Sequence, residues 1–423
     1  MKRVPVTQIV LILLCLMYFI TYLDRTNVST AASGFEKDFG LSKTQIGLVF
    51  SAFAYPYLVI QIIGGWISDR FGARRTLIVC GIVWATATAL TGMAGGLISM
   101  LIARVLLGLG EGATFPAATA AMSRWVPKGQ RGYAQGITHA ASRIGNAAAP
   151  TAVIAIMAAW GWRAAFFVCA GISFVWVAIW AMTFTEFPKN HPRITAAELA
   201  ALTAPPLSPP IIPWGPLIKR MAPVTVVYFC YGWTLWLFLS WIPQYFLHSQ
   251  KLALMQSAWF ASLVYFAGVL GDSLGGIVTD RILKRTGNLR RARSTLVSVC
   301  LLLSTLSLVP LMFSHSAATS LLFLSAGFFF SEMTIGPMWA IPMDIAPHYC
   351  GTASGIMNTG SAMAAIISPV VGGLLIDLTG DYQLPFVGSM VLMGIGVLLA
   401  YRMRPDAKFE TPIRATNGAT RPP

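Results

Sequence analysis

Ionisable side chains interrupt several long apolar stretches of this chain. Asp24 and Arg25 are neighbours in the first stretch. Arg104 and Glu111 lie seven residues apart in a later stretch, on one face of a helix, and Arg143 lies in the next. A charge at the centre of a membrane costs roughly 2.5–3.5 kcal/mol, so we interpret these residues as functional. Arginine can grip a carboxylate with its planar fork, and a buried acid beside it can exchange a proton. The pattern predicts anion binding and proton exchange, with a static network of ion pairs as the alternative.

Other ionisable residues allow more than one interpretation. Glu332 is either a second proton site or a partner in a hydrogen bond between helices. Asp272 either takes part in the chemistry or, as we expect, binds cytoplasmic arginines at a helix end. Arg143 holds the second charge of a dianion, or it pairs with Glu111 or Glu332. His139 is expected to pack or hydrogen-bond within its helix rather than to carry protons.

The composition is that of a membrane protein. The 423 residues are 56% hydrophobic and only 11% charged, whereas a soluble domain averages about 25% charged residues. Twelve apolar runs are each long enough to cross a hydrocarbon layer of roughly 30 Å. They lie near residues 8–32, 44–68, 75–95, 97–122, 131–158, 163–185, 219–247, 256–280, 293–314, 318–341, 351–377 and 383–402. We therefore expect an all-α protein with twelve transmembrane helices and the lipid bilayer around it.

The positions of the charges predict the orientation. The net charge of +15 would fit a nucleic-acid partner, but with both termini in the cytoplasm 23 Lys and Arg residues lie in inner segments and four in outer loops. This asymmetry is the positive-inside rule, so no nucleic acid is needed to explain the charge. The expected location is the cell inner (plasma) membrane. The six cysteines show no metal-ligand spacing and no pairing in outer loops, which argues against a metal site or a disulfide framework.

An internal repeat divides the chain into two halves. The pattern Gly-Gly-x-x-x-Asp-Arg at 64–70 returns 211 residues later at 275–281, and Glu111 returns 221 residues later as Glu332. Repetition of this kind predicts two related structural units. A proline-rich segment lies between them. We expect an N-terminal six-helix bundle at 1–187, a cytoplasmic linker at 188–216, a C-terminal six-helix bundle at 217–403 and a cytoplasmic tail at 404–423.

Residues 65–75 read Gly-x-x-x-Asp-Arg-x-Gly-x-Arg-Arg, which is similar to the loop 2–3 signature of the major facilitator superfamily. The resemblance covers essentially the whole chain. It implies two like-oriented bundles with a binding site between them near the bilayer midplane, opened alternately to each side. It also implies a latch at the inner mouth, in which Asp69 lies at a helix N-terminus and pairs with arginines; anchoring of the loop by its positive charges is the alternative. The expected gating residues are Gly65, Asp69, Arg70, Gly72, Arg74, Asp280 and Arg281.

Two further motifs are more specific. Tyr22-Leu23-Asp24-Arg25-Thr26-Asn27 and Arg104-x-x-x-Gly108-x-x-Glu111-Gly112 resemble the anion:cation symporter family, which includes sugar-acid/proton symporters. The resemblance implies that Arg25 binds the substrate carboxylate, that Asp24 and Glu111 carry protons, and that Arg104 pairs with them. The expected substrate-binding residues are Arg25, Tyr22, Tyr57, Arg104, Arg143, Trp339 and Asn358. The aromatic residues of 228–241 are expected to be mainly anchors to lipid or the membrane interface.

We therefore expect a secondary transporter, not an enzyme, that imports a small organic anion by proton symport and alternating access. The substrate would be a sugar acid or another carboxylate, the protein would work as a monomer, and protons would replace any cofactor. The alternative is an exchanger of organic anions or organic phosphates without net proton coupling. Drug efflux is disfavoured because 145–150 matches poorly the glycine–proline run of such exporters. An ATP-driven pump is disfavoured because the chain has no Gly-x-x-x-x-Gly-Lys-Ser/Thr.

Overall fold

The computed structural model describes residues 4–41, 45, 48–49, 52–202, 212–252, 254–314 and 316–409, which are mostly helical and include no strand. The first helices are α1 (Val6–Thr30), α2 (Ala32–Phe39), α4 (Ala54–Phe71), α5 (Ala73–Gly92), α6 (Leu97–Gly112), α7 (Thr114–Trp125), α8 (Arg131–Trp160) and α9 (Trp162–Thr183). They are followed by α10 (Ala196–Ala201), α11 (Trp214–Gln244), α12 (Leu254–Thr286), α13 (Leu296–Leu308), α14 (Ala317–Glu332), α15 (Ile335–Ile345), α16 (Cys350–Thr379) and α17 (Leu384–Ala400). A π-helical turn at Arg291–Thr295 leads into α13.

Two of the predicted transmembrane runs are each divided into two helices. α6 and α7 meet at Ala113, and α14 and α15 meet at 333–334. With each divided run counted once, the described helices match all twelve predicted runs, although the start of the run at 44–68 falls partly outside the described residues. In the described part of the chain, nine segments are long and apolar enough to cross a membrane. α17, which has 17 residues, α4 and α8 complete the twelve.

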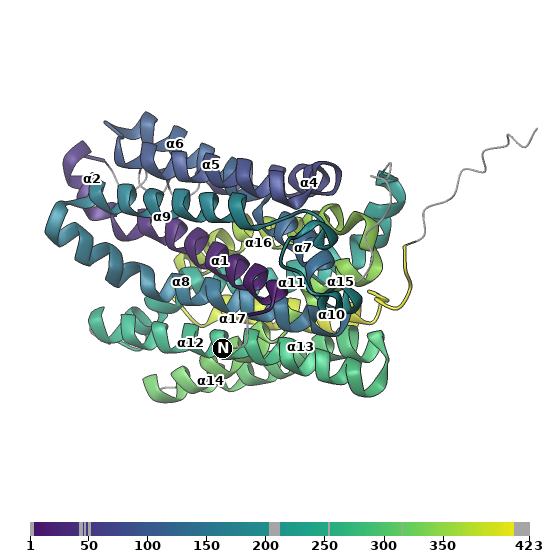
Figure 1. Ribbon diagram of the computed structural model, residues 1–423. Coiled ribbons are helices and arrows are strands. Elements are labelled where there is room, and N and C mark those ends of the chain that lie inside the picture. Colours follow the sequence, from purple (N-terminus) through teal and green to yellow (C-terminus); the bar gives the residue numbers. More distant parts are fainter. Residues whose placement is uncertain are drawn as a thin grey trace, which may run out of the picture.

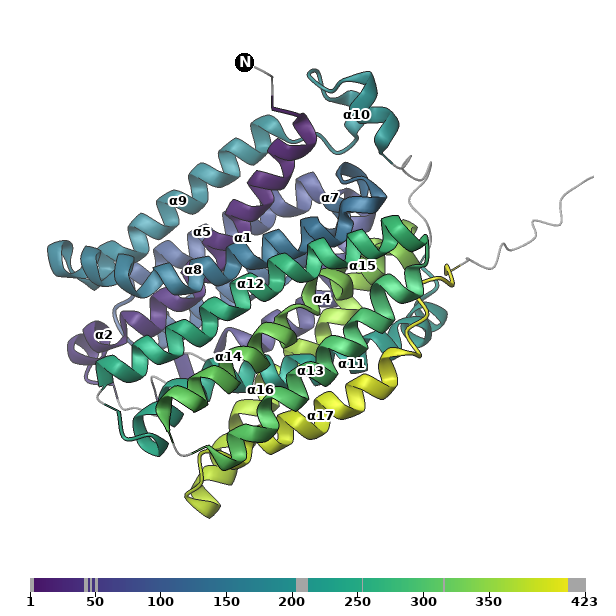
Figure 2. The same ribbon diagram turned by 90° about the horizontal axis from the view of Figure 1, so that it is seen from below.

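The helices run alongside one another in two groups (Figures 1 and 2). In the N-terminal group α1 packs against α8, and α5 packs against α9. In the C-terminal group α11 packs against α16 and α17, and α12 packs against α14. Two extensive contacts join the groups, one between α8 and α12 and the other between α4 and α16. The interface between the halves is therefore built mainly from these four helices.

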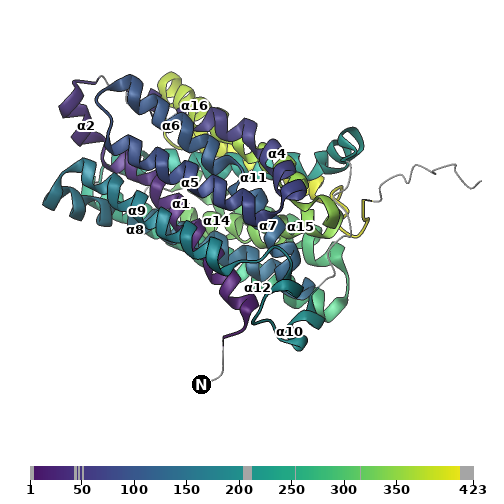
Figure 3. The ribbon, with the colours of Figure 1, turned by 45° about the horizontal axis from the view of Figure 1, so that its top comes forward.

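Both described ends of the chain lie at one end of the bundle with α10, far from α2 (Figures 2 and 3). The backbone N–H of Thr7 donates to Glu198 Oε1 of α10 over 3.4 Å, and the backbone N–H of Phe409 donates to the carbonyl of Ile345 over 2.7 Å. We call the end of the bundle that holds α10 and both described chain ends the terminal end. The four predicted segment boundaries stay predictions, and residues 203–211 of the linker and 410–423 of the tail lie outside the described residues.

At the opposite end, α2 is held against the start of α9. The carboxylate of Asp38 accepts hydrogen bonds from Trp162 Nε1 over 2.9 Å and from Arg163 Nη1 over 2.7 Å. These two bonds hold the pKa of the Asp38 carboxyl below its ordinary value. The contact is therefore complete at neutral pH and is lost as the pH falls through that lowered pKa.

Candidate functional site

Arg25 lies at the centre of the bundle, paired with the buried acid of α6. Its Nε is 2.5 Å from Oε2 of Glu111, which is fully buried. The guanidinium Cζ lies 4.8 Å from the ring centre of Tyr22, 4.7 Å from that of Tyr57 and 5.2 Å from that of Phe115. Aromatic faces attract a cation and keep water away from it. Within the described residues Nη2 of Arg25 has no hydrogen-bond partner, so part of its fork is available to an anion.

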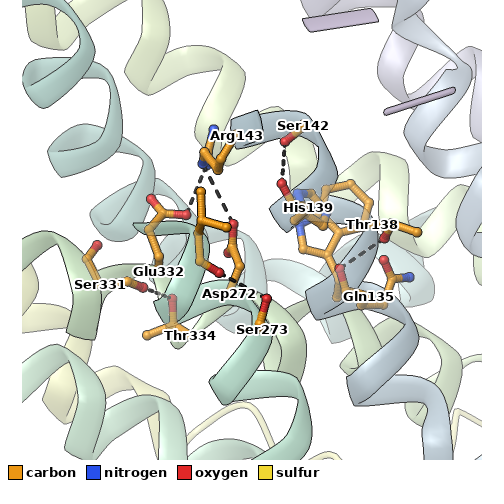
Figure 4. A network of polar contacts seen from close by, with 12 residues as sticks. Gln135, Thr138, His139, Ser142, Arg143, Asp272, Ser273, Ser331, Glu332 and Thr334 are labelled. Carbon is orange, nitrogen blue, oxygen red and sulfur yellow. Dashed lines mark hydrogen bonds and ion pairs between the residues drawn. The ribbon is translucent and has the colours of Figure 1, made fainter. Parts of the chain in front are cut away.

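Arg143 of α8 forms a second buried ion pair, and this one crosses between the halves (Figure 4). Its Nη2 is 2.9 Å from Oε2 of Glu332 on α14, and its Nε is 3.8 Å from Oδ2 of Asp272 on α12. The hydroxyl of Tyr231 on α11 donates to Glu332, 2.9 Å from Oε1. Of the alternatives for Arg143, the structure shows the pair with Glu332. The expectation that Asp272 binds arginines at the helix end is wrong, because the acid faces Arg143 in the interior.

A closed cavity lies between the two arginines. Its volume is about 20 Å³, which is room for about one water molecule. Six of the seven residues predicted to bind substrate line it: Arg25, Tyr22, Tyr57, Arg143, Trp339 and Asn358. Trp339 Nε1 donates to the hydroxyl of Tyr228 over 2.7 Å, and Asn358 Nδ2 donates to Gln61 Oε1 over 2.8 Å. The tertiary structure thus brings these residues together from both halves.

A larger and more open cavity continues from this centre away from the terminal end. It measures about 360 Å³ and shares Tyr22, Arg25 and Trp236 with the closed cavity. Thr26 of α1 and Ala147 of α8 also line it. Both lie further along their helices from the terminal end than Arg25 and Arg143, the arginines of the centre. The larger cavity therefore extends from the centre toward the α2 end.

Arg104 lies outside both cavities. Its Nε donates to the carbonyl of Val49 over 3.3 Å, and Glu111 is paired with Arg25 instead. Among the described residues Arg104 makes no direct ion pair with Asp24 or Glu111, so the expected pairing with these acids stays a prediction. The face of α6 that carries Gly108 is pressed against the start of α4, because a β-carbon on Gly108 would lie 2.3 Å from the carbonyl oxygen of Phe53.

Asp24 points away from the cavities, into the N-terminal half. Ser173 Oγ of α9 donates to its Oδ2 over 3.1 Å. Its Oδ1 has no hydrogen-bond partner among the described residues. Asp24 and its neighbour Arg25 therefore face different surroundings, as expected for consecutive positions that differ by 100° around a helix.

Several site residues were not among those predicted. Tyr231 and Tyr228 of α11 and Trp236 reach the centre, although the aromatic residues of this helix were expected to contact mainly lipid. Gln61 binds Asn358, and a polar amide in an apolar run of α4 was a signal that could have identified it. His139 lines the closed cavity and packs against rings, with centroids 5.0 Å from Tyr18 and 5.1 Å from Trp339. The packing expected for His139 is thus seen.

At the terminal end, Asp69 of α4 lies at the N-terminus of α16. Its carboxylate accepts hydrogen bonds from the backbone N–H of Gly351 over 2.9 Å and of Thr352 over 2.7 Å. A helix N-terminus favours such an anion. A β-carbon on Gly65 would lie 2.3 Å from the carbonyl oxygen of Gly351, so these helices touch backbone to backbone. Asp69 therefore lies at a helix N-terminus, as expected, and that helix belongs to the other half; among the described residues it forms no ion pair with an arginine.

Asp280 of α12 makes the corresponding contact in the opposite direction. It accepts hydrogen bonds from the backbone N–H of Gly132 over 3.1 Å and of Tyr133 over 2.7 Å at the N-terminus of α8. Arg293 lies 3.5 Å from its Oδ1 and binds Asp344 over 3.0 Å. The terminal end is therefore closed by one acid from each half.

The remaining gating residues lie beside these contacts. Arg74 Nε donates to the carbonyl of Phe184 over 2.8 Å, and the backbone N–H of Arg74 donates to Glu186 Oε2 over 2.8 Å. Gly72 has a φ of 90°, which lets α4 turn into α5. Arg70 and Arg281 are not buried. These residues therefore shape the loops rather than join the halves.

Residues 14–369 match the family model described as Major Facilitator Superfamily. The chain belongs to this superfamily. Over the described residues the fold is all-helical, and the twelve helical segments counted there are consistent with the major facilitator architecture. The site between the halves is thus the interior of a transporter rather than that of an enzyme.

Similar proteins of this superfamily are anion transporters. The chain is 45% identical over 416 residues to a probable sulfoacetate transporter of Cupriavidus necator, with 97% of each chain covered. It is 30% identical over 392 residues to a hexuronate transporter of Bacillus subtilis, covering 91% of this chain and 90% of the other. It is 28% identical over 432 residues to a probable galactarate/D-glucarate transporter of Escherichia coli, covering 94% and 92%.

Solved structures show the same major facilitator fold at low identity. The crystal structure of a superfamily transporter in the outward conformation superposes with a TM-score of 0.72 at 14% identity, covering 94% of this chain and 99% of that one. The human organic anion transporter MFSD10 superposes with a TM-score of 0.73 at 15% identity, covering 94% and 100%. The chain is therefore a multi-pass membrane transporter of the major facilitator fold.

Proposed function

We propose that this transporter imports a small organic anion together with protons, by alternating access. The observation that carries the proposal is that two arginines line one buried cavity while each is paired with a buried carboxylate. An anion that binds an arginine displaces its carboxylate. A buried carboxylate without a partner costs several kcal/mol, so the displaced acid is stabilised by taking up a proton. Binding of the anion therefore favours binding of protons, and binding of protons favours binding of the anion.

The geometry supports a set of proposed residue roles. Arg25 binds the acidic group of the substrate, because it is exposed to both cavities and has an unused nitrogen. Glu111, which it then releases, takes up the proton. Asp24 serves as a second proton site in the N-terminal half. Trp339 and Asn358 contact the body of the substrate from the C-terminal half.

Two arginines at one cavity favour a substrate with two acidic groups. Arg25 and Arg143 both border the ring of Tyr22, with Cζ 4.8 Å and 5.6 Å from its centre. Sulfoacetate, after which the relative with 45% identity is named, has a sulfonate at one end and a carboxylate at the other. Glucarate has a carboxylate at each end. We therefore place short dianions, with sulfoacetate first, ahead of monoanionic sugar acids.

The contacts of Asp69 and Asp280 serve as latches of the cytoplasmic mouth. The terminal end then faces the cytoplasm, the larger cavity faces outward, and the protein works as a monomer in the inner membrane. The closed centre is too small for these substrates, so the helices must separate to admit them. Release to the cytoplasm requires both latches to break while the outer side closes.

The test is uptake of radiolabelled sulfoacetate into proteoliposomes with an inward proton gradient. We expect accumulation above the external concentration, abolished by a protonophore, and competition by glucarate but not by acetate. Counterflow of sulfoacetate without any gradient would persist. Sulfoacetate exchange whose rate and extent do not depend on the proton gradient would overturn proton symport and favour the exchanger. Stronger competition by acetate than by glucarate would overturn the preference for dianions.

A further inference from the structure

The environment of Arg143 holds one cation and two acids. Asp272 and Glu332 are both fully buried, and both lie within 3.8 Å of the guanidinium of Arg143 (Figure 4). The acids come from neighbouring helices of the same half. α12 and α14 approach closely there, because a β-carbon on Gly271 would lie 2.3 Å from the carbonyl oxygen of Phe329. If both acids were ionised, the group would carry a net negative charge in a dry interior.

The two acids are not equivalent. Glu332 receives a hydrogen bond from Arg143 at 2.9 Å and another from the hydroxyl of Tyr231, which lies 2.9 Å and 3.0 Å from its two oxygens. Neither oxygen of Asp272 has a hydrogen-bond partner in the described part of the chain. Its nearest cation is Nε of Arg143 at 3.8 Å. Hydrogen bonds therefore stabilise the ionised form of Glu332, whereas no hydrogen bond among the described residues stabilises an ionised Asp272.

In the described part of the chain, no second cation lies beside the two acids. Arg143 is the charged group that faces the acids from α8, where His139 lies one turn earlier. The titratable groups on the other packed helices are tyrosines: Tyr22 of α1, and Tyr228 and Tyr231 of α11. Among the described residues, a single arginine therefore has to balance two carboxyl groups. Like charges held together in a medium of low dielectric constant share a proton rather than both ionise.

We propose that Asp272 and Glu332 form a second proton-binding centre, in the C-terminal half, which holds one shared proton without substrate and a second proton when the substrate takes Arg143. This inference rests on the proposed function. In the substrate-free state the proton is on Asp272, and Glu332 is bound to Arg143. When the second acidic group of the substrate binds Arg143, Glu332 loses its cation and forms an O–H bond with a proton from the outer cavity. After the substrate leaves, Arg143 binds Glu332 again and that proton departs to the cytoplasm.

Infrared difference spectroscopy of the purified, lipid-reconstituted protein tests the shared proton without any substrate. All proteins compared carry Asp24→Asn, which removes the other buried acid proposed to hold a proton. At neutral pH we expect the protein with Asp272 and Glu332 intact to show the C=O band of a buried protonated carboxyl. The band should vanish in Asp272→Asn. It should also vanish in Glu332→Gln, because Asp272 then pairs alone with Arg143 and ionises. Asp381→Asn, which removes an exposed acid, and Glu198→Gln, which removes a half-buried acid of α10, should leave the band unchanged. A band that survives in Asp272→Asn or in Glu332→Gln overturns the shared proton.

The second proton is tested by substrate binding in weakly buffered detergent solution with a pH dye. Addition of sulfoacetate to the wild type should cause proton uptake, and the double variant Asp272→Asn/Glu332→Gln, which leaves no acid beside Arg143 among the described residues, should take up one proton fewer per sulfoacetate bound. Equal uptake in both proteins at matched saturation overturns proton uptake by this acid pair. If sulfoacetate does not bind the wild type, the proposed substrate fails, while the infrared experiment still decides whether the acid pair holds a proton.

Discussion

Asp69 and Asp280 make the same contact in opposite directions across the interface between the halves. Asp69, from the N-terminal half, binds two backbone N–H groups at the start of α16, and Asp280, from the C-terminal half, binds two at the start of α8. The two acids are 211 residues apart, at equivalent positions of the internal repeat. Separation of the halves at the terminal end must therefore break both sets of bonds.

Replacement of Asp69 by asparagine should slow transport more than it weakens binding. Asp69→Asn keeps the shape of the side chain but loses the charge that strengthens its three hydrogen bonds to α16, two from backbone N–H groups and one from the hydroxyl of Thr352. A loss of about 1.4 kcal/mol would change the population of the closed state about tenfold. We expect Vmax for sulfoacetate uptake in proteoliposomes to fall by about that factor while Kd changes little. Asp381→Asn is the matched control on the surface. Unchanged uptake by Asp69→Asn would reduce the motif to a determinant of topology.

A methyl group at Gly65 should open the terminal end. Gly65→Ala would place a carbon 2.3 Å from the carbonyl oxygen of Gly351, and overpacking of this kind costs typically 1–3 kcal/mol. Cys350, at the start of α16, is 1% exposed in the closed arrangement. We expect a maleimide in detergent to label Cys350 faster in Gly65→Ala than in the wild type. Labelling of the other cysteines is measured in Cys350→Ser and subtracted. Gly171→Ala, where a β-carbon meets nothing within 4 Å, is the matched control. Equal labelling in both variants would contradict the latch.

Removal of the guanidinium of Arg25 should abolish substrate binding without unfolding the protein. A charge-assisted hydrogen bond contributes roughly 1.5–3 kcal/mol, so loss of a bidentate grip predicts an affinity at least about 100-fold lower for Arg25→Ala. Arg25→Lys should also bind poorly, because lysine lacks the fork. The measurement is calorimetric titration of sulfoacetate with thermal unfolding as the check on folding. The exposed Arg75→Ala serves as control. Wild-type affinity in Arg25→Ala would rule out this assignment.

Glu111→Gln should uncouple transport from the proton gradient. Glutamine resembles the protonated acid in size and hydrogen bonding, and it leaves Arg25 without its 2.5 Å ion pair. A permanently neutral side chain cannot respond to the gradient, so concentrative uptake should fail. Counterflow needs only exchange of substrate and should survive at least in part. Both are measured in the same liposomes. Accumulation by Glu111→Gln in step with a pH jump would leave Asp24, or the acids beside Arg143, as the coupling sites.

Much of the fold follows from the sequence because its signals are local. An apolar run of about 20 residues has to become a membrane helix whatever surrounds it, since lipid offers its backbone no hydrogen bonds. The repeated Gly-Gly-x-x-x-Asp-Arg indicated two halves, and the family resemblance, together with the charged and aromatic residues of the apolar runs, selected six residues that line one cavity. Arg25 and Asn358 could be assigned to a common site because motifs preserve positions relative to the fold.

The partners of the buried charges depended on the tertiary structure. Helical periodicity shows which residues share a face of one helix, but it does not show what that face meets. Arg104 and Glu111 share a face of α6, yet Glu111 binds Arg25, and Asp272 meets Arg143 rather than the cytoplasmic arginines. These pairs join helices that are distant in the sequence, and close backbone contacts at positions such as Gly108 and Gly271 determine them. The sequence by itself determined which charges enter the membrane, and the packing of the helices decided which acid each arginine holds.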